Sequence, residues 1–218
     1  MRPWVLLRGL GMRFEEVNVR FDSFDADSNF KQTLGQLGAA TGKVPLLIDD
    51  SVTHNGKPLA VSDSLAIVER LYELNPKVWP NDAATRALAR SACAEMHSGF
   101  GSLRSLCPMN IEADLADQGH LLWRDNQDLR RDVARLEALW GELLSASKGP
   151  MLCGEFSAVD AFFAPAVMRV NSYSLPVSKA IASYCARATE LPSVQAWIEG
   201  ALAEQDFLDF EEPYRLKP

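Results

Sequence analysis

The spacing of apolar residues changes near residue 80, and this change constrains the fold more than any other feature of the chain. Before Pro80, stretches with apolar residues at every second position alternate with stretches in which they recur at helical intervals. Beyond Pro80 only the helical intervals continue. Because alternating strands and helices are typical of an α/β domain, the pattern predicts an α/β domain followed by an all-α domain.

Prolines mark the boundary between these two parts. A residue that precedes proline disfavours the helical conformation, and such steps occur at Pro76 and Pro80. We therefore predict a first domain at residues 1–75, a linker at 76–82 and an all-helical domain at 83–218.

The first domain is predicted to contain both strands and helices. Val17, Val19 and Phe21 alternate with polar residues, which is the pattern of a half-buried strand. Asn55-Gly56 favours a tight turn between two strands. The predicted elements are a helix from 3 to about 10, a strand at 15–21, a helix at 26–37, a hairpin of strands 44–48 and 59–61, and a helix that Ser62 or Asp63 caps and Asn75-Pro76 ends.

Charge and hydropathy narrow the range of partners. The chain has 29 acidic and 22 basic residues, and its formal net charge of −7 would repel nucleic-acid phosphates. No stretch approaches the ~20 apolar residues of a membrane-spanning helix, and the apolar start is too short for a signal peptide. We therefore expect a cytoplasmic protein that binds neither nucleic acid nor membrane.

The cysteines and histidines argue against redox and metal chemistry. The four cysteines form no Cys-x-x-Cys pair and should stay reduced in the cytoplasm, which disfavours a thioredoxin-type disulfide oxidoreductase. His54, His97 and His120 lack the spacing of metal ligands, so no metal is expected.

Two short motifs carry a family resemblance. Lys43-Val44-Pro45 precedes the predicted hairpin, and Asp63-Ser64 opens the helix that follows it. In this order the motifs resemble the N-terminal domain of glutathione S-transferases of the bacterial cytosolic type. In that family the Val-Pro peptide is cis, a geometry of only about 5% of X-Pro bonds. The resemblance implies that the Val44 main chain pairs with the cysteinyl unit of glutathione and that Pro45 holds it in place.

The same resemblance assigns the polar residues. Ser64 would bind the γ-glutamyl carboxylate, because backbone N–H groups at a helix start attract an anion. Asp63 would meet the γ-glutamyl ammonium, and Lys43 would reach a carboxylate of the tripeptide. Each residue also has a purely structural alternative: Asp63 and Ser64 as helix caps, Lys43 as a solvated charge and Pro45 as an ordinary turn residue.

The second half of the chain resembles the same family. Ser157 and Asp160 have the spacing of its N-capping box, Pro165 should kink the helix that follows, and residues 191–197 are similar to its closing helix. The resemblance spans nearly the whole chain. It implies a thioredoxin-like N-terminal domain, incomplete at its start, and a helical-bundle C-terminal domain.

A further stretch falls where this family places the helix that faces the cleft. Met96, His97, Phe100 and Arg104 are the predicted contacts for the second substrate. His97 and Arg104 lie seven positions apart, which would put both on one helix face. The alternative is a surface histidine and arginine beside a packed methionine and phenylalanine.

The start of the chain departs from the family pattern. Family members begin with a strand and a loop that carries the Tyr, Ser or Cys in contact with the glutathione sulfur, whereas this chain opens on the helix that follows that loop. Three explanations stay open: a start site assigned too far downstream, a truncated and impaired chain, or a rearranged sheet. The first is favoured, and no residue is predicted as the sulfur-activating group.

The sequence thus predicts a homodimeric glutathione transferase that transfers glutathione, its co-substrate, to a small electrophile in detoxification. Conjugation, isomerisation and peroxide reduction are not separated. The alternative is a non-catalytic module of the same fold that serves binding or assembly.

Overall fold

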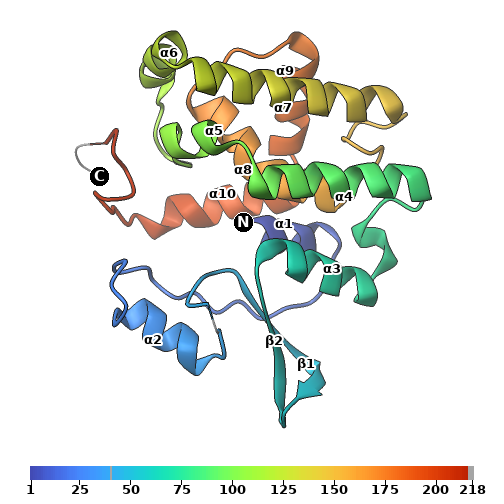
Figure 1. Cartoon of the computed structure of the whole chain (residues 1–218), viewed down its shortest axis with the longest axis vertical. Helices are drawn as coiled ribbons and strands as arrows, with labels where there is room; N and C mark the ends of the chain where they lie inside the picture. The colour runs from blue at the N-terminus through green and yellow to red at the C-terminus, as the bar shows by residue number, and fades with distance from the viewer. Residues whose placement is uncertain (40, 216–218) are drawn as a thin grey trace.

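The computed structural model describes residues 1–39 and 41–215, and Figure 1 shows many helices and one small sheet. The elements are α1 (Arg2–Gly9), α2 (Asn29–Gln36), β1 (Leu46–His54), β2 (Lys57–Ser62), α3 (Ser64–Leu74), the 3₁₀ turn η1 (Pro76–Val78), α4 (Ala83–Ser98), α5 (Gly101–Leu106), α6 (Ala116–Asp125), α7 (Gln127–Ala146), α8 (Ala158–Ser172), α9 (Lys179–Thr189) and α10 (Pro192–Glu204). Both strands precede η1 and the elements after it are helices, so the predicted fold class is confirmed. The division at residues 75 and 83 stays a prediction.

The predicted hairpin is confirmed. Strands β1 and β2 pair antiparallel, and the register places His54 opposite Lys57 across the turn. Asn55 and Gly56 form that turn with positive φ angles of 52° and 74°. Asn and Gly adopt such angles more readily than other residues, which is why this dipeptide sets the register of the hairpin.

The strand predicted at residues 15–21 is wrong. The described sheet consists of β1 and β2, and these residues make no regular structure. Val17 is 63% exposed, whereas Phe21 packs edge-on against the rings of Phe30 and Phe210. Alternating polarity predicts how side chains divide between two faces, but a strand forms only where a second backbone edge exchanges hydrogen bonds with it.

Helix α1 is central to the fold, and Figure 1 shows it between α3 and the helices of the second half. Its buried residues Val5, Leu6 and Leu7 belong to one hydrophobic core with α3, α4, α7 and α8. Helix α8 is buried along almost its whole length and continues through Pro165 as a single helix. Among the described helices, none combines the length and the apolar character needed to cross a membrane.

A buried carboxylate holds the start of α8. Asp160 is 2% exposed, and its Oδ2 accepts a hydrogen bond from the Ser157 backbone N–H at 3.1 Å, so the Asp160 half of the predicted capping box is confirmed. Its Oδ1 accepts from the Leu152 N–H at 3.1 Å and from the Tyr184 hydroxyl at 3.3 Å. Burial nevertheless raises the pKa of Asp160 to about 6.

Candidate active site

One cavity lies where the start of α1, the loop before β1 and the start of α3 meet the second half of the chain. We call it the inner cavity; its volume is about 520 Å³. The described residues that line it are Met1, Arg2, Pro3, Thr41, Lys43, Val44, Pro45, Asp63, Ser64, Met96, His97, Arg104, Met109, Pro165 and Arg169.

This cavity gathers nearly all of the residues predicted as a site. The five predicted for glutathione line it together with three of the four predicted for the second substrate: Lys43, Val44, Pro45, Asp63 and Ser64, then Met96, His97 and Arg104. Phe100 is not among the lining residues; it is 5% exposed and belongs to the hydrophobic core. The fold therefore brings together motifs that the sequence separates by a hairpin and by most of α4.

The loop before β1 presents main chain and an exposed side chain at the cavity. The Val44–Pro45 peptide is cis, as the family resemblance implies. The β1–β2 ladder begins at Leu46, so Val44 lies outside it, and this residue is 58% exposed. Val44 is thus placed so that an extended peptide could pair with its main chain.

Asp63 and Ser64 open α3 at the cavity. Asp63 Oδ1 accepts from the backbone N–H groups of Leu65 and Ala66, at 2.8 and 3.4 Å, so this residue is the helix cap. Ser64 is buried at the first position of the helix. Asp63 has a φ of 79°, a strained conformation for a residue with a side chain. Strained residues of this kind are found most often at functional sites, and Asp63 lies beside the cavity.

His97 links the end of α4 to the start of α3. Its Nε2 lies 3.2 Å from Oδ2 of Asp63, the oxygen that the helix cap leaves free. Both side chains are partly exposed, at 38% for His97 and 49% for Asp63. A ligand ammonium that approached Asp63 would therefore share this carboxylate with the histidine.

Arg104 lines the cavity, but it does not share a helix face with His97 as predicted. His97 and Arg104 do not lie on one helix, because α4 ends at Ser98 and α5 begins at Gly101. Phe100 has a φ of 56°, and a Cβ at Gly99 would lie 2.8 Å from the Glu95 carbonyl oxygen, so the chain turns sharply there. The turn still brings Arg104 back, and its Nη1 donates to the His97 carbonyl oxygen at 3.2 Å.

Two further arginines line the cavity, and the sequence reasoning missed both. Arg2 begins α1, and Arg169 lies on α8. Burial, followed by the charges of Arg104 and Arg169, lowers the pKa of Arg2 to about 10. Burial and then the charge of Arg104 also lower the pKa of Arg169. A lone arginine in the apolar sequence of α8 was the signal that could have identified Arg169.

Burial raises the pKa of every thiol in the protein. All four cysteines are free, and burial raises the pKa of the Cys107, Cys153 and Cys185 thiols to about 12. Burial also raises the pKa of Cys93 well above its usual value. Because a thiol must lose its proton to act as a nucleophile, these raised pKa values disfavour a redox role. Within the described residues, no group of three or more His, Cys, Asp or Glu side chains could hold a metal ion.

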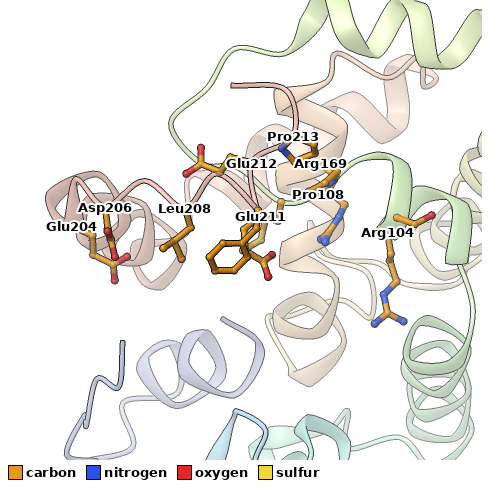
Figure 2. Close-up of a pocket in the computed structure, with 12 residues that line it drawn as sticks. Arg104, Pro108, Arg169, Glu204, Asp206, Leu208, Glu211, Glu212 and Pro213 are labelled. Carbon is orange, nitrogen blue, oxygen red and sulfur yellow. The ribbon is translucent and has the colours of Figure 1, made fainter. Parts of the chain in front are cut away.

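A second cavity, the outer cavity, adjoins the first and has a volume of about 610 Å³. Arg104, Met109 and Arg169 line both cavities. Figure 2 shows Arg104 on the side of the outer cavity away from Glu204 and Asp206, which belong to the end of α10 and the segment after it.

The solved structures that match this chain share one fold. A glutathione transferase homolog from Burkholderia gl BGR1, solved with bound glutathione, matches with a TM-score of 0.60 and 25% identity, over 93% of this chain and 90% of that one. Ure2p in complex with S-p-nitrobenzylglutathione matches with a TM-score of 0.64 and 17% identity, over 91% of this chain and 89% of that one. The chain has the glutathione transferase fold.

The similarity in sequence is weaker than the similarity in structure. This chain with the glutathione transferase fold is 25% identical over 179 residues to Protein IN2-1 homolog A of Oryza sativa subsp. japonica. The aligned residues make up 82% of this chain but only 63% of that protein. No model of a known protein family matches.

Proposed function

We propose that the inner cavity binds glutathione and that the protein transfers it to a small electrophile. The observation that carries this proposal is the convergence of Val44-Pro45 and Asp63-Ser64 on one cavity. The glutathione transferase fold, and neighbours solved with bound glutathione, support it.

Each predicted residue has a role that fits its position. The Val44 main chain pairs with the cysteinyl unit, and Pro45 holds that loop. Ser64 and the N–H groups at the start of α3 bind the γ-glutamyl carboxylate. Asp63 receives the γ-glutamyl ammonium beside His97, and Lys43 binds a carboxylate of the tripeptide.

The cavity also favours the reactive form of the thiol. Arg2, Arg104 and Arg169 place positive charge on its wall, and nearby positive charge stabilises a thiolate relative to a thiol. The thiolate then attacks an electrophilic carbon: a sulfur–carbon bond forms, the bond to the leaving group breaks, and the thiol proton passes to water. Met96, His97 and Arg104 lie where the electrophile would enter. By the same resemblance we propose a cytoplasmic homodimer that acts in detoxification.

A second candidate is a glutathione-binding module without catalysis. The side-chain hydroxyls on the described wall of the inner cavity come from Thr41 and Ser64, and Ser64 is assigned to a carboxylate. Few hydroxyls are thus left to hold the thiolate by a hydrogen bond, which favours this second candidate.

Calorimetric titration with glutathione tests the binding site. We expect Ser64→Ala to weaken binding about tenfold, because one hydrogen bond to a charged group is lost. Ser91→Ala, on an exposed position of α4, is the matched control and should bind as the unaltered chain does. Equal affinities for Ser64→Ala and the control would overturn the site. An assay of conjugation to an aryl halide then separates the candidates, since binding without conjugation would favour the module.

A further inference from the structure

The inner cavity is cationic in a protein that is acidic overall. Its described side chains include four cations, Arg2, Lys43, Arg104 and Arg169, and one carboxylate, Asp63, which leaves an excess of three positive charges. The whole chain, in contrast, has a formal net charge of −7. The cavity therefore carries a local excess of positive charge, opposite in sign to the net charge of the molecule.

The three arginines of this cavity bind carbonyl oxygens rather than carboxylates. Arg2 Nε donates to the Phe162 carbonyl oxygen at 3.1 Å, and Arg104 to that of His97. Arg169 donates to two carbonyl oxygens, from Nε at 2.8 Å and from Nη1 at 3.0 Å. Within the described part of the chain, no carboxylate forms an ion pair with any of the three.

Such a cluster is unfavourable without an anion. Arg2 and Arg169 are partly removed from water, and guanidinium groups in such surroundings are usually paired with carboxylates, as Arg70 is with Asp49 elsewhere in this protein. Here the arginines instead repel one another, and this repulsion adds to burial in lowering the pKa values of Arg2 and Arg169. A bound anion would relieve the repulsion and accept hydrogen bonds from donors that the carbonyl oxygens leave free.

Glutathione alone does not supply enough negative charge. It brings two carboxylates and one ammonium, and one further negative charge when its thiol ionises. Among the residues that line the inner cavity, at least one of the three excess positive charges then stays uncompensated. Arg104 and Arg169 come from α5 and α8, whereas the residues assigned to glutathione come from the loop before β1 and from α3. The uncompensated charge therefore lies on the side that would face a second substrate.

We propose that Arg104 and Arg169, together with Arg2, bind a carboxylate carried by the electrophilic substrate. This inference rests on the proposed glutathione site, because it assigns the other half of the same cavity. The paired geometry of a guanidinium and a carboxylate suits such recognition.

The outer cavity supports the proposal that the substrate carboxylate binds at these arginines. Its described wall contains four acidic residues from the C-terminal part of the chain, Glu204, Asp206, Glu211 and Glu212. Asp206 is paired with Arg20, and Glu212 with Arg215, but Glu204 and Glu211 have no ion-pair partner among the described residues. Negative charge on that wall would disfavour an anion there. Arg104 and Arg169 line both cavities, so an anion is favoured on their inner-cavity side.

Two glutathione conjugates of nearly the same shape test the inference by calorimetry: S-(p-carboxybenzyl)glutathione and S-(p-nitrobenzyl)glutathione. They differ in one negative charge. We expect the carboxyl conjugate to bind about tenfold more tightly, and Arg104→Gln to abolish that preference by weakening the carboxyl conjugate more than the nitro conjugate. Arg187→Gln, which also removes an exposed arginine bonded to a carbonyl oxygen, is the matched control and should keep the preference.

Glutathione itself, titrated beside the conjugates, separates this inference from the proposed function. If glutathione and the nitro conjugate bind and the carboxyl conjugate shows no advantage, the carboxylate site is overturned and the glutathione site stands. A preference that survives in Arg104→Gln would also overturn the assignment. If none of the three ligands binds, the glutathione site fails, and the carboxylate site, which depends on it, fails as well.

Discussion

Asp63 and Asp160 both stand at the start of a helix, yet their surroundings differ. Asp160 is 2% exposed, and both of its carboxylate oxygens accept hydrogen bonds from within the protein. The Asp63 side chain is 49% exposed; it caps α3 with one oxygen and keeps the other on the cavity side, near His97. The comparison shows that burial decides whether a carboxylate at a helix start serves only the fold or can also meet a ligand.

The largest expected difference between the two is in stability. Asp160→Ala should lower the free energy of unfolding by about 3–5 kcal/mol, because it leaves the buried N–H groups of Leu152 and Ser157 and the Tyr184 hydroxyl without their acceptor. Asp63→Ala should lower the free energy of unfolding by only about 1 kcal/mol, the usual loss for an exposed helix cap. Urea unfolding of both variants measures this, and equal losses would contradict the comparison.

The pH dependence of stability is the next largest effect. Burial raises the pKa of Asp160 from 3.8 to about 6, so the folded state holds this proton more tightly than the unfolded state. The resulting stabilisation is fully present below about pH 4 and is lost as the pH rises through about 6, a change on the order of 2–3 kcal/mol. Urea unfolding of the unaltered chain and Asp160→Asn across this range isolates the contribution, since the variant lacks the titrating group. An unchanged difference between the two from pH 4 to 7 would show that Asp160 has no raised pKa.

The smallest effect on folding, and the clearest on binding, is expected at Asp63. Asp63→Asn keeps an oxygen that can cap α3 but removes the negative charge. The free energy of unfolding should change by less than about 1 kcal/mol, whereas glutathione affinity should fall about tenfold. Asp82→Asn is a matched control, because Asp82 caps α4 through Thr85 away from the cavity and should leave affinity unchanged. Unchanged affinity in Asp63→Asn would restrict this residue to its capping role.

Local patterns predicted several elements correctly. Asn55-Gly56 predicted the turn of the hairpin, since few other dipeptides adopt two positive φ angles easily. Apolar residues at helical spacing predicted α3 and α7. The failures share a cause: the strand at residues 15–21 needed a partner edge, and the common helix face of His97 and Arg104 needed an unbroken helix, neither of which local spacing can reveal.

By itself the sequence determined the order of strands and helices, the hairpin turn and, through the family resemblance, the residues to consider for glutathione. Only the tertiary structure placed Arg2 and Arg169 beside Arg104, and only it showed that Phe100 lies in the core rather than in the cavity wall. The physical reason is that turns and helices depend on neighbours along the chain. The charge of a cavity, in contrast, is a sum over residues from distant segments that packing alone brings together.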